Sequence, residues 1–585
     1  MKKLHIAAVM TFSMACVGCN DFLDRTPYTE VSSVAAFSTP AMAETVVTGA
    51  YANLRAEYGN VNGINFDALA SVLDPRDNTL ADSYAYLLGT AQPSAGMFSN
   101  RWKRLYEGIN RANDVINHIY SVPGMDDALK ARRAAECKFL RAYGYYQLNV
   151  LWRGVPIYLE NLSDAEYTRP RNTEQEVWEQ CITDLSDCIN CESIPDRLTA
   201  SSADWGRATR AAALALRAKV YMWQSQWAKA EADLRMVGEL GHSLFRGAYA
   251  DLFTLDNEHC DEMIFSITMT ELAGLGSVMP DIYGNRCTAG YGHGQYFVCP
   301  GFVDSFEWAD GRPFDWDEVI PGYTDLSPRA RSVFFLRDNI TSEELTTAQN
   351  AGADLSKYLP SGNEARVEAA YNGRDPRLAA IAIAPGADYM GGATGSPLPY
   401  RLRYPYRSVN APSFDILTDQ PSAYRYPIRK FVPAGVTIKN PTYSPLDVPV
   451  FRYAGVLIDL AECINEQGRV AEAVAVLNAV RRRAGVAELN SPGNVHTAVT
   501  DVDDMRLRIY KERRWELAGE CVLYYDELRQ GTWKDAKFAP GNGMTEIWGE
   551  CSRPYRWGGD GYDVWPIPRV ELEKNPNLTQ NKGWY

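Results

Sequence analysis

A pair of helical segments occurs twice in this chain of 585 residues, and Ala454 in the second copy stands 243 residues after Ala211 in the first. Within each copy, apolar residues recur at helical spacing on both sides of a short turn, with alanine where two helices would cross closely. Such a unit cannot bury its apolar face alone, so it must stack on neighbouring helices. The first copy contains Ala211, Leu214, Ala218, Tyr221, Ala230, Leu234 and Val237, which match Ala454, Leu457, Ala461, Ile464, Ala473, Leu477 and Val480.

Helical periodicity extends over the residues that precede and include the first copy, so the chain is predicted to be mainly α. An apolar stripe that begins at Trp102 marks one helix, and further helices are expected at about 128–151 and 173–189. The repeated unit resembles the helix–turn–helix of tetratricopeptide proteins. At the end of the second copy, three arginines at 481–483 precede Gly485. They place cations at the negative end of the helix dipole and a permissive residue at its cap.

The composition changes between the two copies. Residues 241–445 are rich in Gly, Pro, Tyr and Asn and have no sustained period. We expect loops, short helices and small β-hairpins there, and a similar irregular segment at 531–585. The predicted architecture is therefore a helical scaffold over about 40–240 and 446–530 that carries a long irregular insertion. Because function in such proteins lies on loops, the insertion is the expected ligand-binding region.

The N-terminus has the features of a bacterial lipoprotein signal peptide. Two lysines precede an apolar stretch at 4–17, which is too short for a transmembrane helix and suits a signal segment. Small residues then lead into Cys19, although Cys16 stands where such signals usually have Leu. We expect residues 1–18 to be removed and Cys19 to carry the lipid anchor. Ordinary secretory cleavage near the same place is the alternative.

The composition and the motifs argue against several classes of protein. The formal net charge is −14, and no cluster of Lys and Arg suits a nucleic-acid backbone. Zinc-protease, nucleophile-elbow and Walker signatures are absent, and the glycine-rich run at 290–294 lacks the context of a phosphate loop. We therefore expect no catalytic residue, no cofactor and no metal. A glycosidase needs only two suitably spaced carboxylates, so hydrolysis stays open as an alternative.

Three local patterns combine a conceivable chemical role with a more ordinary structural one. The CxxC at 188–191 falls within an apolar helical period, so we interpret its cysteines as small buried residues. The carboxylates Asp304, Glu307 and Asp310 lack the spacing of a calcium loop and are interpreted as a solvated helix face. The charged set at 512–516 is expected to form a buried or half-buried ion-pair network that joins its helix to the scaffold.

A set of motifs in a fixed order indicates the family. They include Cys19-Asn20-Asp21-Phe22-Leu23-Asp24, Lys138-Phe139-Leu140-Arg141-Ala142-Tyr143, Leu151-Trp152-Arg153-Gly154-Val155-Pro156, Arg374-Asp375-Pro376-Arg377, Glu512-Arg513-Arg514-Trp515-Glu516, Trp565-Pro566-Ile567-Pro568 and Asn575-Pro576-Asn577-Leu578-Thr579-Gln580-Asn581. Together they resemble the SusD/RagB family over 19–585.

The resemblance implies a single globular domain with about four tetratricopeptide-like helix pairs. It also implies a lipoprotein of the cell outer membrane that faces the exterior and captures a glycan ligand. The expected partner is a SusC-like TonB-dependent β-barrel transporter, onto which the protein docks as a lid. We therefore expect a glycan-binding protein without enzymatic activity and without a nucleic-acid partner. A peptide-binding member, a tetratricopeptide scaffold and a surface hydrolase are the alternatives.

Two segments have the residue types that sugar recognition needs, namely flat aromatic faces and planar polar groups. Tyr291 stands between glycines and Tyr296 close to them, so both rings are expected to project freely. Trp152, Trp515 and Trp565 belong to the family motifs and are expected to be packing residues. The candidate ligand-binding residues are Asp67, Arg76, Asp77, Asn78, Tyr84 and Tyr86 in the first segment, and Tyr283, Asn285, Tyr291, His293, Gln295, Tyr296 and Trp316 in the second.

Overall fold

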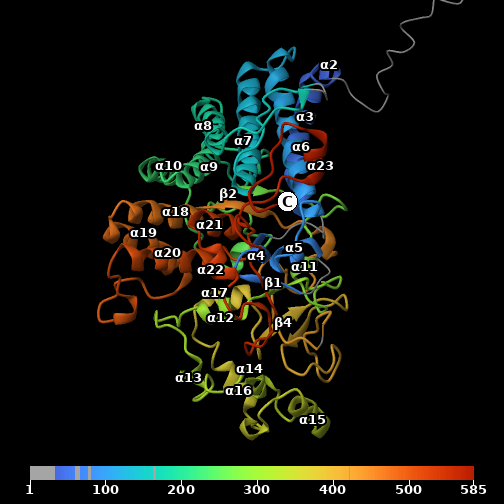
Figure 1. Ribbon diagram of the computed structural model, residues 1–585, viewed down its shortest axis with the longest axis vertical. Coiled ribbons are helices and arrows are strands. Elements are labelled where there is room, and N and C mark those ends of the chain that lie inside the picture. Colours follow the sequence, from blue (N-terminus) through green and yellow to red (C-terminus); the bar gives the residue numbers. More distant parts are fainter. Residues whose placement is uncertain (1–32, 59–65, 77–80, 163–165, 421, 585) are drawn as a thin grey trace, which may run out of the picture.

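The computed structural model describes residues 33–58, 66–76, 81–162, 166–420 and 422–584, and it is mainly helical (Figure 1). A series of long helices forms the scaffold, and each helix packs against the next in the series. Its members are α3 (Pro40–Tyr58), α6 (Gly96–His118), α7 (Asp127–Trp152), α8 (Glu174–Asn190), α9 (Arg210–Trp223), α10 (Trp227–Glu239), α18 (Tyr453–Glu466), α19 (Val470–Ala484) and α20 (Val502–Leu517).

The two copies of the repeated sequence form the pairs α9–α10 and α18–α19, which confirms the predicted helix–turn–helix units. The pairs lie side by side through α10 and α18, although the whole insertion separates them along the chain (Figure 1). Ala211 and Ala218, with their counterparts Ala454 and Ala461, are fully buried. Because these side chains are small, the helices approach closely, and each pair buries the face that it could not bury alone.

The ends of the scaffold helices follow local sequence signals. In α8 the Thr173 hydroxyl accepts a hydrogen bond from the Glu176 backbone, and the Glu176 carboxylate accepts one from the Thr173 backbone. In α9 the Thr209 side chain accepts from the N–H of Ala212. Helix α19 ends at Gly485, whose φ of 79° is left-handed, as the preceding arginines predicted. These caps set the lengths of the helices in each pair.

Short strands connect the scaffold to the insertion. Strands β1 (Leu73–Pro75), β3 (Tyr296–Val298) and β6 (Tyr426–Pro427) form an antiparallel sheet with β3 in the centre. Strand β2 (Met263–Ile267) pairs antiparallel with β7 (Val448–Arg452) and joins the two ends of the insertion. The other hairpins are β4 (Asp388–Gly391) with β5 (Leu398–Arg401), and β8 (Gly543–Thr545) with β9 (Cys551–Pro554).

The insertion contains short helices and turns, in keeping with its glycine and proline content. Its helices are α11 (Met279–Tyr283), α12 (Pro300–Ser305), α13 (Trp316–Val319), α14 (Pro328–Arg331), α15 (Ser342–Asn350), α16 (Asn363–Glu368) and α17 (Pro376–Ile381), with 3-10 turns η4 (Tyr249–Phe253), η5 (Ser332–Phe335), η6 (Leu355–Lys357) and η7 (Pro441–Tyr443). Outside the insertion, the remaining helices are α2 (Ser33–Ala36), α4 (Phe66–Leu69), α5 (Ala81–Leu87), α21 (Leu523–Gln530), α22 (Trp533–Lys537) and α23 (Arg569–Lys574), with 3-10 turns η2 (Ile119–Ser121) and η8 (Val495–Thr497).

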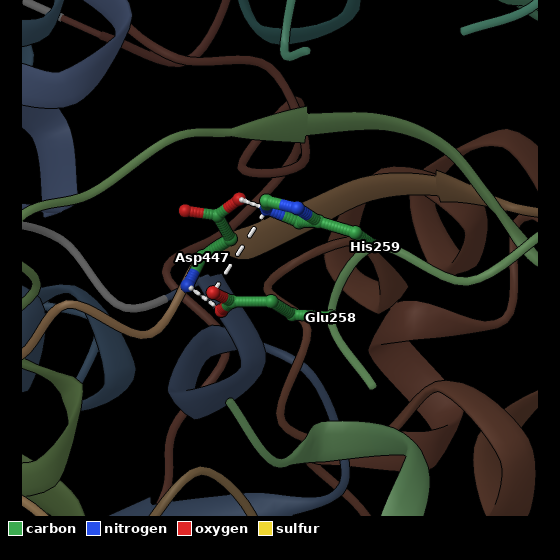
Figure 2. Close-up of side chains that lie close together, drawn as sticks. All are labelled: Glu258, His259 and Asp447. Atoms are coloured by element: carbon green, nitrogen blue, oxygen red, sulfur yellow. Dashed lines mark hydrogen bonds and ion pairs between the residues drawn. The ribbon is translucent and has the colours of Figure 1, made fainter. Parts of the chain in front are cut away.

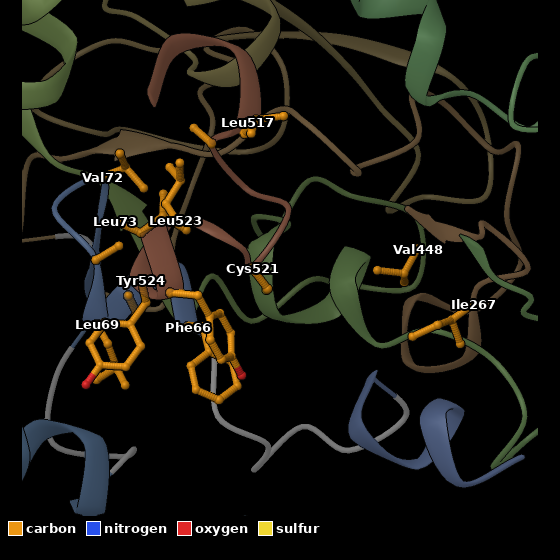
Figure 3. Close-up of a cluster of buried hydrophobic side chains, with 14 of the residues drawn as sticks. Phe66, Leu69, Val72, Leu73, Ile267, Val448, Leu517, Cys521, Leu523 and Tyr524 are labelled. Carbon is orange, nitrogen blue, oxygen red and sulfur yellow. The ribbon is translucent and has the colours of Figure 1, made fainter. Parts of the chain in front are cut away.

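One hydrophobic core joins segments from the beginning, the middle and the end of the chain. Figure 3 shows a part of it in which side chains of α4 and β1 meet those of α21. There the ring of Phe66 stacks on that of Tyr524, with centroids 6.0 Å apart. Trp152, Trp515 and Trp565 are at most 1% exposed, so the prediction that they are packing residues is confirmed. The fold is therefore closed by contacts between residues very distant in sequence.

The charged set at 512–516 forms a buried ion-pair network, as predicted. Glu516 lies 3.1 Å from Arg377 and 3.1 Å from Arg452, and it also pairs with Arg483. Arg513 is held in the same way by carboxylates of α18 and α21. The members come from α17, β7, α18, α19, α20 and α21, so the network ties the insertion to the second half of the scaffold.

The acidic set near α12 does not form the solvated helix face that its spacing suggested. Helix α12 ends before Glu307, which is buried and lies 2.9 Å from Arg481. Asp310 is exposed and Asp304 is half-buried. The prediction was wrong because it assumed that the helix continues to residue 310, whereas α12 has only 6 residues and ends at Ser305.

The ten cysteines among the described residues are free thiols. Cys188 is fully buried in α8, as the apolar interpretation of the CxxC predicted, whereas Cys191 is half-buried at the end of that helix. In the same described part of the chain, no helix has both the length and the apolar character needed to cross a bilayer.

Candidate functional site

The two segments singled out from the sequence meet at the sheet of β1 and β3. Pro75 of β1 pairs with Tyr296 of β3, and the backbone N–H of Arg76 donates to the Gln295 carbonyl at 2.7 Å. The Arg76 guanidinium also donates to the His293 carbonyl at 2.7 Å. Residues far apart in the sequence therefore form one surface, as a shared ligand site would require.

Charged side chains, which we name the Arg76 cluster, gather beside this sheet: Arg76, Asp281, Arg286, His293 and Asp419. Asp419 lies 2.5 Å from Arg76 and also pairs with Arg286. His293 Nδ1 lies 2.5 Å from Asp281 Oδ1. Burial raises the pKa of Asp281, although the hydrogen bond from His293 opposes that effect. The charges largely satisfy one another, so the cluster fixes the loops on which it lies.

Tyr291 is the exposed aromatic residue of this surface. The residue is 53% exposed, and its backbone φ of 66° turns the chain sharply between two glycines. Tyr296, which was expected to project in the same way, is 1% exposed and lies edge-on to Tyr283 at 6.2 Å between centroids. The expectation for Tyr296 was wrong because this residue belongs to the central strand β3, which is buried along its length.

The other candidate residues differ in burial. Asp67 accepts the backbone N–H of Cys521 at 3.0 Å, and burial raises the pKa of its carboxyl to about 7. That carboxylate therefore links α4 to the segment before α21. The side chains that lie in the protein interior are Asp67, Arg76, Tyr84, Tyr86, Tyr283 and Asn285, while His293 is exposed and Gln295 is half-buried. Cys19, Asp77 and Asn78 lie outside the described residues.

A large open cleft of about 1010 Å³ lies next to β1, whose Asp74 lines it. Its walls come from α12, the chain from α13 to α14, the outer face of α20, α22 and the β8–β9 hairpin. Of the described candidate residues, Trp316 lines this cleft. Other aromatic lining residues are Phe302, Tyr323, Tyr510, Trp548 and Tyr555, and planar polar groups come from Asp304, Arg331, Arg506, Arg514 and Asn542.

The wall formed by the insertion combines aromatic and charged groups. Trp316 stacks on Tyr323 with centroids 4.6 Å apart and planes 18° apart, and both residues are buried, so each offers only a small part of its surface to the cleft. The Arg331 guanidinium lies 4.9 Å from the Tyr323 ring centre and donates to the Tyr323 carbonyl at 3.0 Å. This arrangement holds a cation at the cleft, and no carboxylate among the described residues forms an ion pair with Arg331.

Asp304 supplies a carboxylate to the same wall. Burial raises the pKa of Asp304 to about 6, and a hydrogen bond with the Trp316 side chain partly opposes this effect. Its Oδ1 is shielded and has no hydrogen-bond partner among the described residues. Because a shielded carboxylate oxygen normally accepts a hydrogen bond, a water or a ligand hydroxyl is expected to donate to it. The cleft thus suits a ligand that carries many hydroxyl groups.

Comparison with family models identifies the chain. Residues 262–584 match the model of the SusD family. The chain belongs to the SusD family. Residues 21–222 match a second model, described as starch-binding associating with outer membrane. The SusD match covers the insertion from residue 262 onward, most of the cleft walls and the C-terminal segment, and it confirms the family that the ordered motifs indicated.

Individual members of the SusD family align along most of the chain. SusD-like protein P25 from Formosa agariphila is 25% identical over 603 residues, covering 99% of this chain and 98% of the relative. The starch-binding protein SusD of Bacteroides thetaiotaomicron is 24% identical over 476 residues, covering 79% of this chain and 74% of that protein. A crystal structure of a SusD-like carbohydrate binding protein from Bacteroides fragilis matches with a TM-score of 0.71 at 22% identity, covering 93% of this chain and 99% of that one. The structural match confirms the fold.

Most residues of the cleft were missed from the sequence of this SusD-family chain. Tyr510 and Arg506 lie on the outer face of α20, and their helical spacing resembles that of any solvated face. Trp548 lies in the turn of the β8–β9 hairpin, a segment near the C-terminus that has no local motif. Asp304 had been noted only as part of a possible calcium set. The high density of aromatic residues between 302 and 323 could have indicated this wall of the cleft. Of those residues, only Trp316 was chosen as a candidate.

Proposed function

We propose that this protein binds a glycan in the cleft beside β1 and delivers it to a SusC-like TonB-dependent β-barrel transporter, without hydrolysing it. The observation that carries this proposal is the open cleft of about 1010 Å³ whose wall places Asp304, Arg331 and Trp316 together. Ligand pockets usually measure about 300–1,000 Å³, so the cleft suits a ligand of several sugar units.

The chemistry of the wall fits a polyol better than an apolar ligand. A carboxylate accepts hydroxyl donors, a guanidinium donates to ring and hydroxyl oxygens, and both are planar groups that bind two neighbouring oxygens. Trp316 and Tyr323 are buried and stack on each other, so little of their ring surface is accessible and hydrogen bonds should contribute more to recognition in the cleft than stacking does. Tyr291, which lies outside the cleft lining, offers a ring face for a longer chain of sugars.

The relatives support carbohydrate as the ligand class. One is named a starch-binding protein, and another is a SusD-like carbohydrate binding protein. Their identities to this chain are 24% and 22%, so the particular sugar is left to experiment. A peptide ligand, the main alternative, is included in the same experiment.

Isothermal titration of the protein against a panel of polysaccharides and peptides tests the proposal. The Asp304→Asn and Trp316→Ala variants are expected to weaken binding of the best glycan by roughly tenfold or more, because a hydrogen bond to a charged group contributes about 1.5–3 kcal/mol. Asp310→Asn is the matched control, since Asp310 is exposed, lies in the same segment and does not line the cleft.

Three results would contradict the proposal. Binding to peptides and to no glycan would show that the ligand is a peptide and not a carbohydrate. If both cleft variants keep the wild-type glycan affinity and Tyr291→Ala loses it, the binding site lies on the surface beside the Arg76 cluster and not in the cleft. Release of reducing sugar during incubation with the bound glycan would show hydrolysis.

The membrane anchor and the transporter are proposals of the same kind. We infer that Cys19 carries the lipid and that the protein faces the exterior of the outer membrane. The name of the second matching family model, which refers to association with the outer membrane, supports this location. Metabolic labelling with a radioactive fatty acid tests it, because label should enter the wild type and not Cys19→Ala. Co-purification of a β-barrel transporter from outer membranes tests the partner.

A further inference from the structure

A separate group of side chains lies at the junction of β2 and β7, and it belongs neither to the cleft nor to the Arg76 cluster. Glu258 and His259 stand in the turn that precedes β2, and Asp447 stands immediately before β7. Figure 2 shows the three side chains facing one another. One imidazole nitrogen and one oxygen from each carboxylate lie within 4.8 Å of one another.

Two distances within this group can be compared with the dimensions of a metal site. His259 Nε2 lies 3.3 Å from Asp447 Oδ2 and 3.9 Å from Glu258 Oε1. In a tetrahedral zinc site with ligand bonds of about 2.0–2.1 Å, neighbouring ligand atoms lie about 3.3–3.4 Å apart. The His259–Asp447 pair already has this spacing, and the His259–Glu258 pair needs a shift of about half an ångström to reach it.

Neighbouring groups hold the three side chains in this orientation. Asp447 Oδ1 accepts the Met269 N–H at 2.8 Å, and Glu258 Oε2 accepts the Asp447 N–H at 2.8 Å. The His259 ring lies against that of Trp205, with centroids 4.4 Å apart. By contrast, the Trp205 indole donates to Asp447 Oδ2 at 3.4 Å, longer than an ordinary bond of about 2.9–3.0 Å. The Asp447 oxygen that faces His259 is thus the more weakly hydrogen-bonded of its two, as in metal sites whose outer partners orient the ligands.

The charges and the exposure of the group also suit a cation. The Asp447 side chain is 5% exposed and that of Glu258 is 16% exposed, so two carboxylates are held together away from most of the solvent. His259 is 38% exposed, which leaves an open side where water can complete the coordination.

We propose that Glu258, His259 and Asp447 bind a divalent transition-metal cation, for which zinc is the best-fitting probe. An imidazole nitrogen with two carboxylate oxygens is a donor set that zinc accepts, and a site for calcium would need more oxygen ligands. The bound ion ties the turn before β2 to the start of β7. Since these strands join the two ends of the insertion, the ion stabilises the folded chain and has no part in sugar recognition.

Zinc titration of the metal-free protein, purified without a polyhistidine tag, tests this site. We expect one ion per chain with micromolar or tighter affinity and a rise in the midpoint of thermal unfolding. Two variants remove a ligand while keeping its packing: His259→Phe keeps a ring on Trp205, and Asp447→Asn keeps an acceptor for the Met269 N–H. Each is expected to weaken zinc binding at least tenfold and to abolish the thermal shift, while glycan affinity stays unchanged.

His118→Gln is the matched control, because His118 lies 3.2 Å from Asp114 on a surface helix and resembles an adventitious zinc site. Its zinc affinity should equal that of the wild type. Wild-type affinity in both ligand variants, or no binding at millimolar zinc, overturns the proposal. If a variant does not fold, an anomalous scattering map of zinc-soaked wild-type crystals decides: a peak between the three side chains supports the site, and peaks only elsewhere overturn it.

Discussion

Replacing Glu516 by glutamine tests how much the buried ion pairs contribute to stability. Glu516 lies 3.1 Å from both Arg377 and Arg452, pairs with Arg483 and is fully buried. Glutamine keeps the size of the side chain but leaves three guanidinium groups facing a neutral amide. Removing one partner of a buried ion pair typically costs about 3–5 kcal/mol, because the remaining charge stays buried.

The pKa of Glu516 gives a second value for the free energy that its ion pairs contribute to stability. Burial alone would raise the pKa of Glu516, but Arg483, Arg452 and Arg377 lower it from 4.5 to about 2. A decrease of that size corresponds to about 3 kcal/mol of stability at neutral pH, in agreement with the first value. Because the folded-state pKa lies below the unfolded one, this stabilisation is complete above about pH 4.5 and is lost as the pH falls towards 2.

Urea unfolding followed by circular dichroism at two pH values measures both effects. Glu516→Gln is expected to be about 3 kcal/mol less stable than the wild type at pH 7, and the difference should fall to about 2 kcal/mol at pH 3.5. Glu488→Gln, which removes a surface partner of Arg482, is the control and should change little. A loss below about 1 kcal/mol at pH 7, or a difference that does not shrink on acidification, refutes the reasoning.

Three further predictions follow from local geometry. Gly485→Ala should lower stability by about 1 kcal/mol in urea unfolding, because φ there is 79° and a Cβ is strained in that region; no loss would contradict the left-handed cap. Ala218→Leu should lower stability by about 1–3 kcal/mol, since Ala218 is fully buried where the helices of the pair meet; a stabilised variant would show unfilled space there. Burial raises the pKa of Cys287 to about 12, so its thiol should react with Ellman's reagent far more slowly in the folded than in the unfolded protein; equal rates would contradict its burial.

The helical scaffold could be predicted from the sequence because its determinants are local and repeated. Ala211 and Ala454 occupy the same place in two helix pairs, and Gly485 marks a helix end by its own conformation. The spacing of residues 304, 307 and 310 gave a wrong prediction for the opposite reason. Helix α12 is too short for a helical repeat to extend over all three residues. Periodicity is therefore reliable over several turns and unreliable over one.

The candidate site was only partly predictable, because burial is a property of the packed chain. The two chosen segments do converge on β1 and β3, but most of their aromatic rings fill the core, and Tyr291 is the one that is exposed among those described. Composition gives the residue types of a sugar site and does not say which rings face solvent. The cleft adds a second obstacle: its walls come from α12, α20, α22 and the β8–β9 hairpin, which only the tertiary fold brings together.

The Arg374-Asp375-Pro376-Arg377 motif, which helped to indicate the family, has a physical role in this cleft. Arg374 donates to the carbonyls of Val303 at 2.8 Å and Phe306 at 2.7 Å, which flank Asp304 on the insertion wall. Arg377 binds Glu512 at 2.6 Å and Glu516 at 3.1 Å on α20, whose outer face forms the opposite wall. One short segment is therefore bonded both to the backbone beside Asp304 and to two carboxylates of α20. The motif therefore belongs to the scaffold that holds the insertion wall of the cleft against α20.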